Sequence, residues 1–268
     1  MSALAAVVLS LALAAAACAA DPAQSARDPL QWTLVWSDEF DADGPPDPAR
    51  WTYERGMVRN REEQTYTDDP RNARVEGGML IIEAHRQDVG KARFTSASLT
   101  TRGLAQWNEG RFEVRAKLPA ARGTWPAIWM LGSHIREVGW PRCGEIDIME
   151  HVGFDPGKVH CTIHTDAYNH VKGTHKAGNI DVPTATADFH TYWLEWSRTT
   201  LLFGIDEHEV FRYEKQPGAG DDTWPFDHPH YLLINLAVGG SWGGRKGVDD
   251  AAFPQRFEVD YVRVFRRR

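Results

Sequence analysis

The stretch "RFEVRAKLP", residues 111–119, decides the fold class of this 268-residue chain. Its apolar side chains, Phe112, Val114, Ala116 and Leu118, alternate with charged side chains. A period of two is typical of a strand that buries one face and leaves the other in water. The stretch therefore predicts a half-buried β-strand.

Similar runs recur along the chain, and no stretch sustains a helical period with capping residues. Many strands separated by Gly, Pro and Asp turns predict a single all-β domain, either a sandwich or a barrel. A sandwich with bent sheets would have a concave face, a cleft suited to a polymer. The further strands are expected at residues 79–85, 145–152, 158–165, 189–197, 200–207, 208–214, 231–239 and 257–265.

The composition limits the kind of partner. The net charge is −7 and no basic run is present, whereas nucleic acids and anionic membranes are bound by clustered Lys and Arg. The chain contains 11 tryptophans, which favour either a large β-core or a surface that stacks on flat apolar faces such as sugar rings. We therefore expect an uncharged partner and no nucleic acid.

Residues 1–20 have the pattern of a secretory signal, an apolar run followed by small residues, rather than of a membrane span. No Lys or Arg precedes the run, which departs from that pattern. Cys18 follows "AAA" and resembles a weak lipoprotein box. We expect a secreted or periplasmic protein, with a lipid anchor through Cys18 as the alternative.

Two cysteines, Cys143 and Cys161, remain after the signal. An exported protein could pair them. A hairpin turning at residues 154–157 would place Cys161 near Met149 or Glu150, far from Cys143, so two buried free thiols are favoured.

The stretch "GEIDIMEHVG", residues 144–153, carries three carboxylates among apolar residues. On a strand, Glu145 and Asp147 would share one face, whereas Glu150 would point to the other. A β-bulge near Ile148 or Met149 would bring all three to one face, and bulges are over-represented beside active sites. The alternative is an edge strand with solvated acids.

Such a cluster fits the hydrolysis of a glycosidic bond. Retaining hydrolysis uses two carboxyl groups about 5 to 5.5 Å apart, one ionised and one protonated. Mutual repulsion raises the pKa of at least one acid and keeps a proton available near neutral pH. The spacing alone allows either Glu145 or Glu150 in either role.

These residues resemble the catalytic signature of glycoside hydrolase family 16, in the bulged form of its laminarinases. The resemblance covers about residues 34–264. Its blocks are "WSDEF" (36–40), "NREEQTYT" (60–67), "GRFEVRAKLP" (110–119), "GTWPAIWML" (123–131), "WPRCGEIDIME" (140–150), "INLAVGGSWGG" (234–244) and "FPQRFEVDYVRV" (253–264).

The resemblance implies that residues 29–268 form one β-jelly-roll catalytic domain, a sandwich of two curved antiparallel sheets with a concave substrate cleft. It implies retaining endo-hydrolysis of β-1,3-glucan by a monomer that needs no organic cofactor. Glu145 matches the nucleophile, Glu150 the general acid/base, and Asp147 the residue between them that tunes their charge.

The resemblance also implies substrate contacts on both sides of the acids. For each tryptophan the alternative is core packing, which we favour for Trp129, and for Asn60 and Glu63 it is a solvated loop. The residues implied to contact substrate are Asn60, Glu63, Trp125, Trp129, Trp140 and His164.

The sequence offers candidate ligands for zinc and for calcium. A zinc site on the face shared by His160 and His164 lacks a third ligand at a suitable spacing; His228 and His230 are expected in loops or at the surface. Many laminarinases of this family carry a structural calcium, and its ligand positions match Glu39, the Gly78 carbonyl and Asp260. The alternative is that Asp38 and Glu39 merely end a strand.

Three rival functions remain open. One is hydrolysis of mixed β-1,3/1,4-glucan, and another, less favoured in an acidic chain, is hydrolysis of agarose or carrageenan. The third is a non-catalytic glucan-binding module on the same fold. Modules of that kind typically lose the catalytic carboxylates, whereas all three are present here.

Overall fold

The structure is a computed structural model that describes residues 31–268. The signal predicted over residues 1–20, with Cys18, lies outside the described residues. No helix within residues 31–268 has the length and apolar character to cross a membrane.

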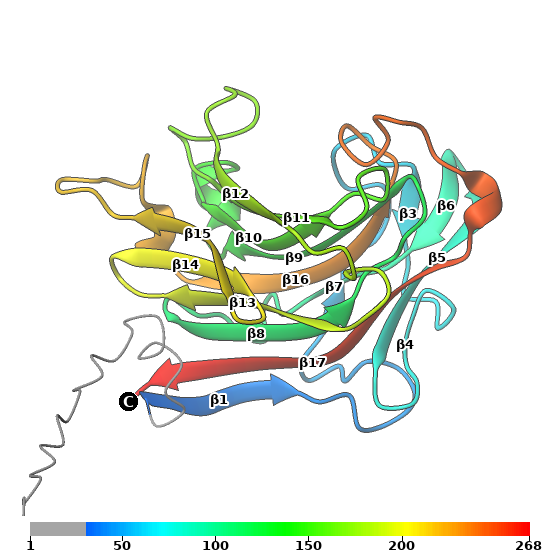
Figure 1. Cartoon of the computed structure of the whole chain (residues 1–268), viewed down its shortest axis with the longest axis horizontal. Helices are drawn as coiled ribbons and strands as arrows, with labels where there is room; N and C mark the ends of the chain where they lie inside the picture. Colours follow the sequence, from blue (N-terminus) through cyan, green and yellow to red (C-terminus); the bar gives the residue numbers. More distant parts are fainter. Residues whose placement is uncertain (1–30) are drawn as a thin grey trace, which may run out of the picture.

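The described strands form two sheets of ten and seven strands (Figure 1). Every pairing within residues 31–268 is antiparallel except that of β3 with β6. The ten-stranded sheet runs β15 (His208–Glu214), β14 (Thr200–Ile205), β13 (His190–Trp196), β8 (Gly110–Lys117), β17 (Gln255–Arg267), β5 (Leu80–Val89), β6 (Ala92–Ser96) and β3 (Gln64–Tyr66), with β1 (Trp32–Asp38) beside β17 and β4 (Ala73–Val75) beside β5. The seven-stranded sheet runs β12 (Lys176–Asp181), β11 (Lys158–His164), β10 (Glu145–His151), β9 (Thr124–Gly132), β16 (His230–Val238), β7 (Ser98–Thr100) and β2 (Thr52–Tyr53).

The helical segments of the described chain are short. They are α2 (Ile135–Val138), η2 (Pro225–Asp227) and η3 (Asp250–Ala252). The architecture is the predicted all-β sandwich, in which both sheets contribute to one hydrophobic core. From β8, Phe112 and Val114 are buried in this core, and from β10, Ile146 and Ile148. Full burial of one such side chain contributes about 1.5–3 kcal/mol.

The predicted bulge is present in β10. Asp147 pairs with Trp129 of β9 and Met149 pairs with Ile128, so Ile148 is the additional residue on β10. The extra residue resets the alternation. Glu145, Asp147 and Glu150 therefore share the face of the seven-stranded sheet that points away from the ten-stranded sheet, which we call the outer face.

The two cysteines are free and buried, as favoured from the sequence. Cys161 lies on β11 opposite the bulge, and its thiol donates to the carbonyl oxygen of Ile148 at 3.2 Å. A bulge leaves backbone groups without ladder partners. The Cys161 thiol satisfies one of them.

Several strands and one histidine differ from the expectations. Strands β1 to β4, β6, β7, β9 and β12 were not among the expected ones. Strand β9 was not predicted, because its residues form a continuous apolar run containing Pro126, and proline is disfavoured inside sheets. His230 was expected in a loop or at the surface, but it begins β16 and is fully buried. Its imidazole packs against the ring of Trp196, which is distant in sequence, and against the ring of Phe226 in η2.

Candidate active site

The three acids of β10 are crowded together on the outer face. Asp147 is only 3% exposed, and Glu145 and Glu150 are half-buried. Burial raises the pKa of all three carboxyl groups, and repulsion by neighbouring carboxylates raises the pKa of Glu145 and Asp147 further. The cluster therefore retains at least one proton near neutral pH.

A tryptophan indole holds each glutamate. Nε1 of Trp140 donates to Oε2 of Glu145 at 2.8 Å, and Nε1 of Trp125 donates to Oε1 of Glu150 at 3.0 Å. Trp125 lies on β9, which pairs with β10, and Trp140 lies between α2 and β10. Both bonds lower the pKa of their carboxyl groups, opposing the effect of burial. The indoles thus fix the two carboxylates in place and favour their ionised forms.

His164 faces the same carboxylates from β11. It pairs with Glu145 across the two strands. Its Nε2 lies 3.6 Å from Oε1 of Glu145 and 3.4 Å from Oδ2 of Asp147. Burial, together with the neighbouring His170 and His175, lowers the pKa of His164 to about 3. His164 is therefore neutral near pH 7.

The carboxyl groups of β10 can supply both a nucleophile and an acid. Two glutamates with separate hydrogen-bond donors flank a buried aspartate, and the cluster holds a proton that can be shared among them. One ionised carboxylate supplies a nucleophile, and one protonated carboxyl supplies an acid. These are the two groups required for retaining hydrolysis of a glycosidic bond.

Comparison with known proteins places this site in a family. Residues 57–263 match the family described as "Glycosyl hydrolases family 16". The chain belongs to glycosyl hydrolase family 16. A "Beta-glucanase" of Rhodothermus marinus is 52% identical over 88% of this chain and 85% of that protein.

Solved structures of family 16 share the fold. The X-ray structure of the laminarinase from Rhodothermus marinus has a TM-score of 0.86 at 52% identity, covering 88% of this chain and 98% of that one. A non-specific endo-β-1,3(4)-glucanase of family 16 has a TM-score of 0.84 at 45% identity, covering 90% and 93%. The all-β jelly-roll expected from the sequence is therefore confirmed.

The seven-stranded sheet carries a second polar network. It lies beside Trp129, which is 6% exposed. Its Nε1 donates to Oδ1 of Asn235 at 2.8 Å, and Nδ2 of Asn235 donates to the Tyr66 hydroxyl at 3.0 Å. Tyr66 in turn donates to Glu62, a residue buried to 4% exposure. Trp129 thus has a fixed orientation, and it packs in a small apolar cluster with Leu131 and Tyr231 that is separate from the core between the sheets.

Asn60 and Glu63, the loop residues predicted to contact substrate, have different partners in the structure. Asn60 donates through Nδ2 to the buried Glu62 at 3.2 Å. Glu63 instead pairs with Arg93 at 2.6 Å. Sequence reasoning did not single out Glu62, although it stands beside Glu63 in the same block. No local pattern distinguishes the two, because the backbone of Glu62 pairs with that of Gly239, which is distant in sequence.

Two further residues on this side were also missed. The guanidinium of Arg59 lies 4.9 Å from the ring centroid of Trp129, and its charge lowers the pKa of Glu145. The ring of Trp242 contacts Trp125 at 5.6 Å and His160 at 5.0 Å. Trp242 lies in a block quoted for the family resemblance, which was the one signal that pointed to it.

The calcium prediction falls on carboxylates that bind arginines. Both oxygens of Glu39 accept hydrogen bonds from Arg263, at 2.7 to 3.2 Å, and Asp260 accepts one from Arg115 at 2.5 Å. Glu39 directly follows β1, as the alternative expected. In the structure both carboxylates are therefore engaged by arginines. The calcium site stays a prediction.

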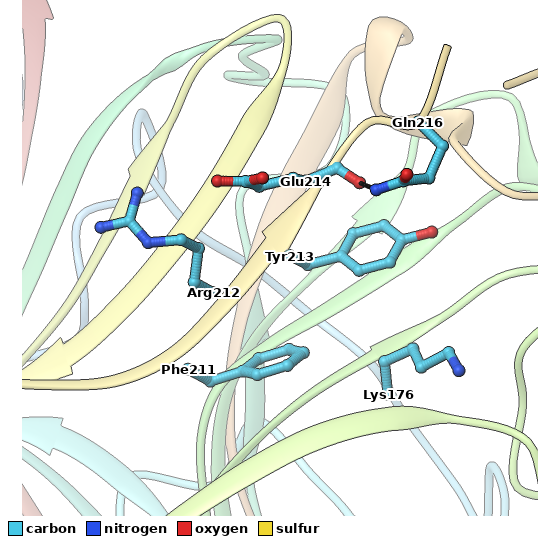
Figure 2. A pocket seen from close by; sticks show the side chains of 6 residues that line it. All are labelled: Lys176, Phe211, Arg212, Tyr213, Glu214 and Gln216. Atoms are coloured by element: carbon cyan, nitrogen blue, oxygen red, sulfur yellow. Dashed lines mark hydrogen bonds between the residues drawn. The ribbon is translucent and has the colours of Figure 1, made fainter. Parts of the chain in front are cut away.

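A surface depression of about 470 Å³ lies apart from the acids, where the edge strands β12 and β15 approach each other (Figure 2). Tyr213 extends along it but donates its hydroxyl to the Thr223 carbonyl. None of the three acids of β10 lines this depression, so it is no part of the candidate active site. Its lining residues are Lys176, Phe211, Arg212, Tyr213, Glu214 and Gln216.

Proposed function

We propose that the protein is a retaining endo-hydrolase of β-1,3-glucan. The observation that carries the proposal is the bulged strand β10, which presents two indole-bound glutamates and a buried aspartate on one face. Support also comes from relatives named laminarinase and glucan endo-1,3-β-glucosidase; the latter, from Cryptopygus antarcticus, is 38% identical over 87% of this chain.

In the first step, the ionised Glu145 attacks the anomeric carbon while Glu150 protonates the leaving glycosidic oxygen. In the second, Glu150 takes a proton from water, which attacks the anomeric carbon and releases Glu145. Burial and Glu150 raise the pKa of Glu145 to about 8, and the indole of Trp140 opposes this rise by favouring the ionised form required for attack. Repulsion by both glutamates raises the pKa of Asp147, which keeps a proton within the cluster.

The glucan chain crosses the outer face in this proposal. Trp140 and His170 stand together at the Glu145 end, with ring centroids 5.0 Å apart. Trp125 and Trp242 stand together at the Glu150 end. Aromatic rings pack well on the apolar faces of sugars. Rings on both sides of the acids suit a substrate that extends past the cleavage point in both directions, as endo-action requires.

The test is reducing-sugar release from laminarin by the wild type and the Glu145→Gln variant. Removing the nucleophile should reduce kcat at least about 1000-fold. Glu258→Gln, which removes a carboxylate of the ten-stranded sheet, is the matched control and should keep its activity. Unchanged activity in Glu145→Gln would refute the assigned mechanism.

Azide rescue separates the two roles. In Glu145→Ala, azide replaces the lost nucleophile and should yield a glycosyl azide of inverted configuration. In Glu150→Ala, azide attacks the covalent intermediate and should yield the retained configuration. The opposite pattern would exchange the roles of the two residues.

Mixed β-1,3/1,4-glucan is the second candidate substrate. The observation in its favour is the 45% identical relative, described as a non-specific endo-β-1,3(4)-glucanase. Mixed-linkage glucan and agarose should therefore be assayed in parallel with laminarin. Cleavage of laminarin well above both others supports the first proposal, and equal cleavage of laminarin and mixed-linkage glucan supports the second.

Export and a monomeric state are also part of the proposal. The support for export is the apolar pattern of residues 1–20. Mass spectrometry of the protein recovered outside the cytoplasm should show removal of these residues, or a lipid on Cys18. Sedimentation should give the mass of one chain.

Calcium binding at Glu39 and Asp260 should raise the melting temperature on addition of CaCl₂. An unchanged melting temperature would end that proposal.

A further inference from the structure

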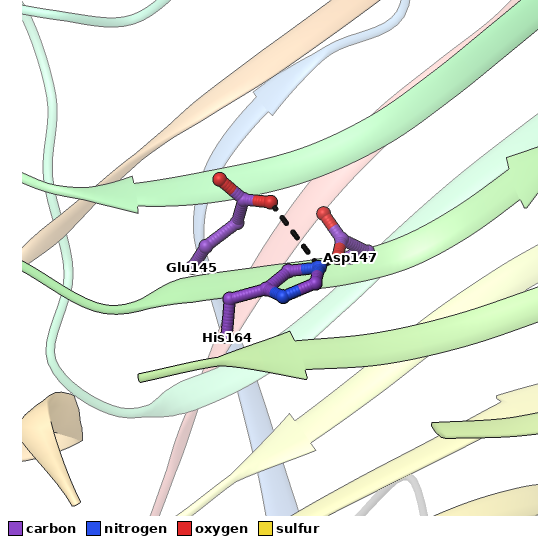
Figure 3. A group of neighbouring side chains, drawn as sticks. All are labelled: Glu145, Asp147 and His164. Atoms are coloured by element: carbon purple, nitrogen blue, oxygen red, sulfur yellow. Dashed lines mark ion pairs between the residues drawn. The ribbon is translucent and has the colours of Figure 1, made fainter. Parts of the chain in front are cut away.

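Three potential metal ligands converge in the active site. Nε2 of His164, a carboxylate oxygen of Glu145 and one of Asp147 all lie within 4.8 Å of one another. Figure 3 shows the imidazole of His164 pointing at both carboxylates. The sequence offered no third ligand along β11 for a zinc site. In the structure, both additional ligands come from the neighbouring strand, β10.

Two of the three ligand-to-ligand distances match a small tetrahedral ion, and the third, between oxygens of Glu145 and Asp147, is at most 4.8 Å. Zn–N and Zn–O bonds of about 2.0–2.2 Å give ligand-to-ligand edges of about 3.3–3.5 Å in a tetrahedron. Nε2 of His164 lies 3.4 Å from Asp147 and 3.6 Å from Glu145. The one nitrogen and two oxygens also match the donors that zinc accepts, whereas calcium takes six to eight oxygens.

One ligand atom lacks any other partner. Among the described residues, no group donates a hydrogen bond to Oδ2 of Asp147, although only 3% of the residue is exposed. This oxygen faces Nε2 of His164. A buried carboxylate oxygen without a donor is costly, and a divalent cation would satisfy it while screening the repulsion between Asp147 and Glu145.

We propose that His164, Glu145 and Asp147 form an inhibitory site for a divalent transition-metal ion, with Zn²⁺ as the probe. The ion occupies the position between the nucleophile and His164 and leaves its fourth coordination position to water. Because the ion binds the attacking oxygen of Glu145, it and the glucan exclude each other. Metal binding itself does not depend on the proposed substrate.

The test is calorimetric titration of ZnCl₂ into the full chain near neutral pH, in a buffer that does not bind zinc. The wild type should bind one ion at this site, and His164→Gln should weaken that binding at least about 10-fold. Co²⁺ in place of Zn²⁺ should give the visible absorption bands of a tetrahedral site. Equal zinc binding by wild type and His164→Gln would overturn the proposal.

The matched control is His228→Gln. The ring centroid of His228 lies 4.4 Å from that of His134, and its Nε2 lies 3.2 Å from Asp221, so it is a histidine beside a carboxylate outside the proposed site. This variant should keep the site and its affinity. Loss of the binding event in His228→Gln, with retention in His164→Gln, would place the ion elsewhere and refute the proposal.

Two additional measurements keep the outcome clear. If His164→Gln shows no cooperative melting, Asp147→Asn replaces it, since this substitution keeps the side-chain volume and removes a ligand charge. Zinc should inhibit laminarin cleavage competitively, and EDTA should restore it. If the chain cleaves no glucan, calorimetry still decides the metal site, so failure of the proposed function is distinguishable from failure of this proposal.

Discussion

The two sheets carry charged residues on their outer faces in opposite ways. On the ten-stranded sheet, Arg111 of β8 binds both Glu113 and Glu195, and Lys117 lies 2.9 Å from Glu258. On the seven-stranded sheet, the acids of β10 lie against one another, and their hydrogen bonds come from tryptophan indoles. Strand β8 places charged side chains at alternate positions, and β10 does so except across its bulge.

The neighbouring strands create the difference. A cation beside a carboxylate stabilises its ionised form, so the acid serves only as half of an ion pair. Where the acids face tryptophans and a neutral histidine instead of a paired Lys or Arg, burial and repulsion raise their pKa and the acids keep a proton for chemistry. Pairing makes the first face structural, and its absence makes the second face reactive.

The largest further effect is expected for Glu150→Gln. Without its general acid, the enzyme should lose about 100- to 10,000-fold in kcat on unactivated glucan. The raised pKa of Glu150, about 7, means that the wild type loses activity as pH rises through that region. The variant should lose this basic limb of the pH profile. A basic limb that persists unchanged would show that another group carries the proton.

A smaller effect is expected for Trp140→Phe, which keeps an aromatic ring but removes the indole donor of Glu145. A hydrogen bond to a charged group is worth about 1.5–3 kcal/mol, or roughly 10- to 100-fold. Its loss raises the pKa of Glu145, so the acidic limb of kcat/KM should move to higher pH. Trp193→Phe is the control, since its indole binds the backbone oxygen of Asp206 on the other sheet. Identical acidic limbs in wild type and Trp140→Phe would contradict the prediction.

The sequence predicted this comparison only in part. The alternation in β8, and the spacing of Glu145, Asp147 and Glu150 that required a bulge, are local patterns, and the structure contains both. The strand β9 was missed because a continuous apolar run with a proline has no period of two.

The indole bonds could not be predicted from spacing. They join Trp125 and Trp140 to β10 across separate elements, so they depend on how strands pair and not on the sequence of one strand. His230 was assigned to the surface for the same reason, since its burial comes from distant aromatic rings. Roles for individual acids came from the family resemblance alone.

On the paired face, Arg111→Gln should lower stability. Its guanidinium binds Glu113 and Glu195 and lies 4.8 Å from the ring centroid of Trp193. Only 12% of the side chain is exposed, so the variant removes a largely buried positive charge from beside both carboxylates. We expect a loss of about 2–3 kcal/mol in the free energy of unfolding. Denaturant melts measure it, and kcat on laminarin should stay unchanged, because the face is structural.

On the unpaired face, removing a charge should have the opposite sign. The pKa of Glu145 is raised in the folded state, so the folded protein binds more protons than the unfolded chain between the ordinary carboxyl pKa and the raised one. Stability due to this group therefore falls as pH rises through that window. Glu145→Gln abolishes the titration and should be more stable than wild type at pH 8, by about 1–2 kcal/mol.

The gain should shrink towards acid pH, because below the ordinary carboxyl pKa both states are protonated and Gln differs little from a neutral Glu. Melting curves of wild type and Glu145→Gln from acid to alkaline pH measure this, with Glu258→Gln of the paired face as the control, for which no such gain is expected. A Glu145→Gln variant less stable than wild type at pH 8 would mean that Trp140 and Arg59 compensate fully for burial of the charge. The reactive face would then carry no stability cost, and the contrast between the two sheets would lie in their chemistry alone.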